Sequence, residues 1–468
     1  MVESIFILIL CLILVSLPSW LLLGLIIPVC IILESSKILP ELFKIGETNF
    51  YISTLFILIT IIKTYFFSRH SLNLHKVHLA SLTFLAILFM TTTAAYMGFG
   101  EDIFNKEIIP LLRLTVDFSV IFLLAHAIER ESQIQWAIKT IDVLGYALAV
   151  NIYLEIFSCF SGIDIGIYNK IHYQGDVYRF FGIIGDQVGY ILLFFYIYKI
   201  LKGNYIGAIF FLGAIIATGT RAAFVGIMVS IIFLIYFTDI SHKYFEKLRL
   251  PVISLILIII VFFFLDIGGI KTRLSASEEF ERSYIQRTIS MNLALNIVLD
   301  NPLIGVGYNG FHLITKNYDA EGQFMYEHGS YRENFDANAQ NQFLQVAVDG
   351  GILALAVFFW MMAVFLRSLR VAATYANVEQ KAFFLAGFIW LLSLLLGVQT
   401  ACWILPASLV FYLLLLILGL GGALLTLQVS SVSRGTPKLL EVSWRQMIAP
   451  QHSFIKGKWL PKVPLANE

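Results

Sequence analysis

The chain has 468 residues, of which 59% are hydrophobic and 13% are charged, and its mean hydropathy is +0.82. Soluble domains are about half apolar and about one quarter charged, so this apolar excess is too large for a single soluble core. The net charge of +1 supplies no basic field that would favour a nucleic-acid partner.

Apolar runs long enough to cross a membrane recur along the whole chain. A membrane-crossing helix needs about 20 mostly apolar residues. We therefore expect an all-α, polytopic membrane protein of about 12 transmembrane helices, with one large extracytoplasmic loop that contains helices. The N-terminus lacks the features of a removable signal peptide, so the first run is expected to stay in the protein. The predicted runs are 5–31, 50–67, 79–99, 107–127, 136–160, 182–200, 205–219, 222–238, 251–266, 341–366, 381–397 and 403–427.

The Lys and Arg residues between these runs predict the orientation. Loops that would be cytoplasmic if both termini were cytoplasmic carry more Lys and Arg than the alternate, outer loops. Both termini are therefore expected on the cytoplasmic side. This divides the chain into nine spans in 1–266, a large extracytoplasmic loop at 267–340, three spans in 341–429 and a basic cytoplasmic tail at 430–468.

Part of the outer loop has the pattern of a helix. The stretch "SASEEFERSYIQRTISMNLALNIVLDNPLIGVG" begins with a capping residue, Ser277, and is stopped by Asn301 and Pro302. Gly305 and Gly307 then punctuate the following loop. One apolar stripe predicts that this helix lies on the membrane domain or on its own loop, and it consists of Ile285, Ile289, Leu293, Ile297 and Val298.

Three arginines are predicted at the outer face: Arg179, Arg221 and Arg287. The guanidinium group is always protonated and grips phosphate with two hydrogen bonds, so this set would suit an anionic lipid headgroup or a diphosphate leaving group. Each also has a simpler interpretation. Arg221 could anchor a turn, Arg179 could reach toward the membrane surface, and Arg287 could be an ordinary solvated helix residue. No Walker A, HExxH or GxSxG motif is present, and the four cysteines show no metal-ligand spacing.

Amide side chains crowd the entry to the tenth run, in "NFDANAQNQFLQVAVDGG". Amides are costly in hydrocarbon unless a partner satisfies them, so this string is expected at the rim of an outer-face cavity. There the amides would bind sugar hydroxyls or hold the loop across the site. Gly350 and Gly351, at the end of the string, would allow another helix to approach closely.

Four segments together resemble, in order, the motifs of the O-antigen ligase and polymerase superfamily. That superfamily has an R-x-x-G segment with a polar turn, an S/T-x-x-R-G/A turn, a PLxGxG stretch after a loop helix, and HNxxLQxxxxxGxxGL entering a span. The matching segments are "RFFGIIGDQVGYILLF" at 179–194, "ATGTRAAFVGIMV" at 217–229, "NPLIGVGYNGF" at 301–311 and "AQNQFLQVAVDGGILALAVFF" at 339–359.

The resemblance implies a metal-independent, cofactor-free glycosyltransferase in the outer leaflet of the bacterial inner membrane. Its substrate would be a glycan on undecaprenyl diphosphate, with membrane lipid, a flippase and chain-length regulators as further candidate partners. Arg221 and Arg287 would be catalytic, and Arg179 would hold the diphosphate. The remaining residues implied to bind substrate are Asp186, Gln340, Asn341 and Gln345.

The chain departs from the superfamily at one letter. Where ligase-like members carry a functional histidine, this chain has Gln340, followed by the matching Asn341. An amide cannot accept a proton near neutral pH, so Glu333 or Asp336 would assist the acceptor, or no side-chain base is needed. The loss favours a polymerase of repeat units over a ligase that transfers the glycan to lipid A core or another acceptor. A lipid-linked glycan flippase or transporter is the alternative of another class, and it would use Arg113, Asp117 and Glu155 inside the bundle.

Overall fold

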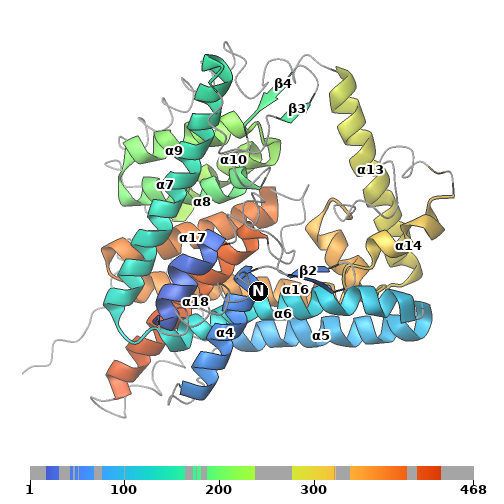
Figure 1. Ribbon diagram of the computed structural model, residues 1–468, viewed down its shortest axis with the longest axis horizontal. Coiled ribbons are helices and arrows are strands. Elements are labelled where there is room, and N and C mark those ends of the chain that lie inside the picture. Colours follow the sequence, from blue (N-terminus) through green and yellow to red (C-terminus); the bar gives the residue numbers. More distant parts are fainter. Residues whose placement is uncertain are drawn as a thin grey trace, which may run out of the picture. The chain divides into compact units, whose positions relative to one another are not determined.

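The computed structural model (Figure 1) describes most of the chain. Two units make up the chain, Met1–Thr426 and Leu427–Glu468, and the features below belong to the first. The described residues are 17–30, 43–45, 48–50, 52–67, 76–99, 101–163, 172–174, 177–180, 187–237, 277–320, 322, 338–397 and 408–433.

Helices lie where the apolar runs predicted them. Every predicted run contains helix within its described residues except 251–266, which lies outside the described part of the chain. The helices in chain order are α2 (Ser19–Leu21), η1 (Leu22–Ile26), α4 (Ile52–Phe67), α5 (Lys76–Phe99), α6 (Glu101–Ala127), α7 (Glu131–Ser161), α8 (Val188–Lys202), α9 (Tyr205–Thr218), α10 (Arg221–Phe237), α13 (Ser277–Asp300), α14 (Phe311–Tyr318), α16 (Gln342–Tyr375), α17 (Val378–Gly397) and α18 (Leu409–Ser433).

Among the described residues, 6 helical segments are long and apolar enough to cross a membrane. They lie in α5, α6, α7, α16, α17 and α18. Shorter apolar helical segments occupy Ser19–Cys30, Ser53–Thr64, Tyr205–Thr218 and Ala222–Phe237. The chain is thus a multi-pass membrane protein, while the count of twelve spans stays a prediction.

Two short hairpins interrupt the helical fold, and the sequence analysis did not predict them. Strand β1 (Phe43–Ile45) pairs antiparallel with β2 (Thr48–Phe50). Strand β3 (His172–Gln174) pairs antiparallel with β4 (Val177–Arg179), with Tyr173 opposite Tyr178. The expected all-α class is therefore correct for the membrane-crossing elements but omits these hairpins.

The core is built both by helices that are consecutive in the chain and by helices that lie far apart in it. Helix α8 packs against α9 and α17, and α16 packs against α5 and α17. A hydrogen bond of 2.8 Å from Trp390 Nε1 on α17 to the Tyr190 carbonyl on α8 satisfies a polar group in the apolar core. Such contacts matter in a membrane, where no water can take the place of a missing partner.

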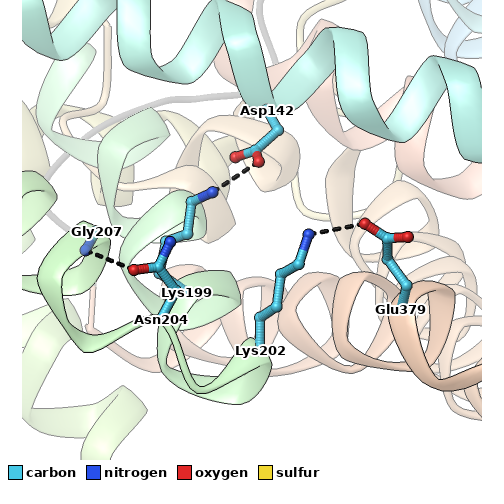
Figure 2. A network of polar contacts seen from close by, with 6 residues as sticks. All are labelled: Asp142, Lys199, Lys202, Asn204, Gly207 and Glu379. Carbon is cyan, nitrogen blue, oxygen red and sulfur yellow. Dashed lines mark hydrogen bonds and ion pairs between the residues drawn. The ribbon is translucent and has the colours of Figure 1, made fainter.

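An ion-paired junction joins α7, α8 and α17 (Figure 2). Lys199 Nζ lies 2.6 Å from Asp142 Oδ2, and the Lys199 side chain is only 3% exposed. Lys202 Nζ lies 2.7 Å from Glu379 Oε1, in a pair that is about one third exposed. The ring of Tyr146 faces Lys199 Nζ at 4.5 Å, a distance suited to a cation–π contact. Lys202 and Glu379 lie in loops that were predicted to be cytoplasmic, whereas Asp142 lies within the predicted run 136–160.

The outer-loop helix is α13, and it packs as the apolar stripe predicted. Leu293, Ala294 and Ile297 are buried in one cluster with Phe311 and Ile314 of α14. Ile289 and Val298 pack against the same cluster, and α13 also contacts α16. Ile285 is the exception, since it is 44% exposed and does not belong to the buried stripe. The helix therefore rests both on its own loop and on the membrane domain.

Candidate functional site

The membrane helix α16 is broken shortly after it begins. Gly350 has φ −142° and ψ 18°, and Gly351 has φ 65° and ψ −166°, so neither residue is helical. The chain resumes as a helix at Ile352. A break of this kind removes the hydrogen bonds that a continuous helix would make across it, and inside a membrane protein the freed groups need other partners.

The loop after α13 supplies those partners. The Val306 and Gly307 amides donate to the carbonyl oxygens of Val348 and Asp349, at 2.8 and 3.0 Å. In the opposite direction, the Ile352 amide donates to the Pro302 carbonyl at 2.8 Å. The "PLIGVG" segment thus binds the interrupted helix through backbone hydrogen bonds. The loop at 302–310 that contains this segment is here called the docking loop.

Two glycines make this close approach sterically feasible. A Cβ atom on Gly305 would lie 2.3 Å from the Val348 carbonyl oxygen, and one on Gly351 would lie 2.3 Å from the Leu303 carbonyl group. Both residues also have a positive φ, which L side chains rarely adopt. The expectation that Gly350 and Gly351 admit another helix is correct only for Gly350, whose Cβ would lie 3.3 Å from Thr91 Oγ1 on α5. Gly351 instead admits the loop.

The amide-rich string before the break is held by its own side chains. Asn341 caps α16, its Oδ1 accepting from the Phe343 and Leu344 amides at 2.9 and 3.1 Å. Gln345 is 5% exposed, and its Oε1 accepts from the Ala339 amide at 2.9 Å. Of the two uses expected for these amides, the structure shows these side chains holding the loop.

Gln340 occupies a special position in this string. It is one of two non-glycine residues with a positive φ among those described, with φ 53°. Its amide donates to Asn338 Oδ1 at 2.9 Å. Gln340, which stands where ligase-like members of the resembled superfamily carry a histidine, therefore lies at a tight bend immediately before the cap of α16.

Asp349 is a functional candidate that the sequence analysis missed. Its side chain is 4% exposed, and Oδ1 accepts hydrogen bonds from the Asn309 amide at 3.1 Å and from Gln345 Nε2 at 2.8 Å. One carboxyl group thus fastens both loops that flank the break, around 305–309 and around 338–345. The signal was available in the sequence, because an acidic residue lies directly before two glycines within an apolar run.

A second group of segments meets at the turn between α9 and α10. Gly219 has φ 60° and ends α9, and Thr218 Oγ1 lies 3.0 Å from Thr220 Oγ1 inside the turn. The start of α8 packs closely here, since a Cβ on Gly189 would lie 3.1 Å from both threonine side chains. The Phe180 amide, directly after β4, donates to the Ala217 carbonyl at 3.4 Å. This bond joins the residue after Arg179 to the end of α9, four residues before Arg221 in the chain.

Arg221 is the first residue of α10. The amino end of a helix carries a partial positive charge, so an arginine at this position does not stabilise the isolated helix. An anion bound at this helix end would interact favourably with the partial positive charge.

Residues 206–359 match the family model described as O-antigen ligase. The search of the curated proteins found no match.

The O-antigen ligase segment, residues 206–359, contains the α9–α10 turn, α13, the docking loop and the break in α16. It makes up about a third of the chain and confirms the resemblance for this part. Arg221, Arg287 and Gln340 lie inside it, and Arg179 and Asp186 precede it.

The predicted site residues are described to different extents. Arg287 is half-buried on α13, the helix that packs against α16. Arg179 and Arg221 are described by their backbone alone, in β4 and α10. Asp186, Glu333 and Asp336 lie outside the described residues, so their expected roles stay predictions. Among the residues that the structure describes, no three His, Cys, Asp or Glu side chains are grouped so as to hold a metal ion.

Proposed function

We propose that this protein is a glycosyltransferase of the outer leaflet of the bacterial inner membrane, with both termini in the cytoplasm. It would polymerise oligosaccharide repeat units carried on undecaprenyl diphosphate into O-antigen, capsule or exopolysaccharide. One observation carries the proposal: the O-antigen ligase segment coincides with the two most specialised parts of the fold, the Arg221 turn and the broken helix α16.

The proposed chemistry needs positioning and charge neutralisation more than a reactive side chain. The acceptor hydroxyl oxygen attacks the anomeric carbon of the donor sugar, and the bond from that carbon to the diphosphate oxygen breaks. The diphosphate leaves with the bonding electrons, and the hydroxyl proton passes to a base. Arg179, Arg221 and Arg287 are assigned to the diphosphate, because fixed guanidinium groups stabilise the charge that grows on the leaving oxygens.

The loops around the broken helix are assigned to the sugars. Gln345 and Asp349 hold the segments at 338–345 and 305–309 together through hydrogen bonds of 2.8 to 3.1 Å. Because both donors to Asp349 bind the same oxygen, Oδ1, we assign this carboxyl group to positioning the loops. The base then remains Glu333 or Asp336, or water.

Gln340 favours the polymerase over the ligase within this chemistry. An amide cannot take the proton that a histidine would take, so the acceptor must be activated differently from the acceptor of the ligase-like members. Glycan analysis after deletion of the gene separates the two activities. Single repeat units left on the carrier or on lipid A core would establish a polymerase, whereas long chains that stay unattached would establish a ligase.

Arginine substitutions test the site itself. We expect Arg221→Ala to abolish polymer while the protein still inserts into the membrane, and Gln340→Ala to have a milder effect. Arg370→Ala is the matched control, because Arg370 is an exposed arginine near the other end of α16. Full-length polymer made by the Arg221→Ala protein would contradict the proposed diphosphate role.

The transporter alternative rests on a different observation. Arg113, Asp117 and Glu155 are 7%, 6% and 1% exposed, and charged residues inside a membrane bundle often serve transport. A reconstituted transporter would move the lipid-linked glycan across vesicles without lengthening it. If the chain is a transporter, Glu155→Gln should stop the movement of the lipid-linked glycan across the vesicle membrane. If it is a polymerase, the length of the glycan chain should depend on Arg221 and should not require this movement.

A further inference from the structure

We propose that the carboxyl-terminal half of α13 and the turn that follows it are embedded in lipid, next to the broken helix. The surface concerned, here called the apolar patch, consists of large apolar side chains that are exposed in the protein. Their exposed fractions are 37% for Met291, 47% for Leu295, 66% for Leu299, 68% for Leu303, 43% for Ile304 and 61% for Ile352.

The patch is a second apolar face of α13, separate from the buried stripe. Met291, Leu295 and Leu299 recur every four residues, so they lie along one edge of the helix. Leu293 and Ile297, on the opposite side, are 7% and 0% exposed and pack on α14 and α16. A solvated loop helix needs only the buried stripe, so the exposed apolar edge requires its own explanation.

Charge along α13 changes where the patch begins. Residues 288–299 contain no charged side chain, and the next one is Asp300. The amino-terminal part is different, because residues 277–287 contain Glu278, Glu279, Glu281, Arg282 and Arg287. Charged groups are costly in hydrocarbon. The absence of charged residues from 288–299 is therefore expected if only the carboxyl-terminal half of α13 lies in lipid.

The patch is continuous with the surface of a membrane-crossing helix. The Ile352 amide donates to the Pro302 carbonyl at 2.8 Å, which sets Ile352 beside Leu303. Farther along α16, Phe359 and Trp360 are 48% and 42% exposed, on the part of α16 that crosses the membrane. Since that face meets lipid acyl chains, the adjoining patch is assigned the same neighbour.

Lipid fits this surface better than a protein partner does. The patch presents no charged group that would orient a specific partner, and contiguous apolar surface on a membrane protein is covered most simply by acyl chains. Embedding here would hold the docking loop, and with it the break in α16, at the boundary between lipid and water. A lipid-linked substrate would present its headgroup at this depth.

Neighbouring residues on α13 provide the test. In a variant whose cysteines are replaced by alanine, Leu295→Cys and Leu303→Cys are each labelled with a fluorophore, and the protein is reconstituted in phosphatidylcholine vesicles. The matched control is Asn296→Cys, because Asn296 is also exposed but lies about 100° farther around the helix than Leu295. Quenching is measured with nitroxides on the lipid acyl chains and with iodide in the water.

We expect acyl-chain nitroxide to quench the labels at Leu295 and Leu303 several-fold more than the label at Asn296, with the reverse order for iodide. Equal access of iodide to Leu295 and Asn296 would overturn the proposal, because the patch would then face water. Protection of Leu295 and Leu303 from both quenchers would also overturn it, in favour of a protein partner or a second copy of the chain. If Leu303→Cys fails to fold, Met291→Cys reports on the same patch, and none of these readouts depends on the proposed transfer activity.

Discussion

Gly351→Ala should release the docking loop from the broken helix. The added Cβ would lie 2.3 Å from both the carbon and the oxygen of the Leu303 carbonyl, and these are backbone atoms that cannot rotate away. Gly351 also has φ 65° and ψ −166°, a conformation that an L side chain adopts only under strain. The two effects act in the same direction, against the docked loop.

The structure provides an estimate of the size of this effect. Backbone strain of this kind costs about 1–3 kcal/mol for a residue other than glycine. Docking is further secured by three backbone hydrogen bonds, from Val306, Gly307 and Ile352, and each contributes about 1 kcal/mol. Separation of the loop would lose about 3 kcal/mol of hydrogen bonds in total, so the strain of about 1–3 kcal/mol and the clash together are large enough to favour the undocked loop.

Hydrogen–deuterium exchange in detergent or nanodiscs measures this directly. The Val306 and Gly307 amides should be protected in the natural protein and should exchange rapidly in Gly351→Ala. Gly322→Ala is the matched control, because Gly322 has almost the same φ, 66°, but a Cβ there meets nothing within 4 Å. This control carries backbone strain without the clash, so exchange of the docking loop should not change.

The reasoning would be refuted if Val306 and Gly307 stayed as protected in Gly351→Ala as in the natural protein. It would also fail if Gly322→Ala exposed the docking loop to the same degree, since strain elsewhere would then explain the result. If the docking loop shapes the sugar site, Gly351→Ala should in addition shorten or abolish polymer, whereas Gly322→Ala should not.

Four further substitutions test contacts of individual side chains, each by the thermal unfolding midpoint in detergent. Gln345→Leu leaves the Ala339 amide without its partner, which should destabilise by about 1–3 kcal/mol, and it removes one of the two hydrogen bonds to Asp349, which keeps the Asn309 amide. Asn341→Ala removes the cap of α16 and should cost about 1 kcal/mol. Asp142→Asn leaves a buried lysine charge uncompensated and should cost about 3–5 kcal/mol, whereas Glu379→Gln, in the more exposed pair, should cost less than about 1 kcal/mol. If Asp142→Asn and Glu379→Gln lowered the stability equally, the conclusion that burial makes the Asp142 ion pair more important would be wrong.

Much of the fold could be predicted because its causes are local in the chain. An apolar run of sufficient length becomes a helix in a membrane, since only a helix satisfies its own backbone there. Asn301–Pro302 predicted the end of α13, and that helix does end at Asp300.

The candidate site was predicted less completely, because its decisive contacts join distant residues. The sequence analysis identified the amide string and the glycines around it but not the role of Asp349. Its carboxyl group acquires a role only when the docking loop arrives 40 residues away along the chain. The junction of Lys199 with Asp142 has the same character, because its partners are 57 residues apart.

The sequence by itself determined that the chain crosses a membrane several times, that it resembles the O-antigen ligase superfamily, and where α13 ends. Those properties follow from hydrophobicity, helix capping and turn chemistry, which act over a few neighbouring residues. Only the tertiary structure decided that α16 is broken and that "PLIGVG" fills the break. A freed carbonyl or amide accepts any partner of suitable geometry, so which segment supplies that partner depends on how the whole chain packs.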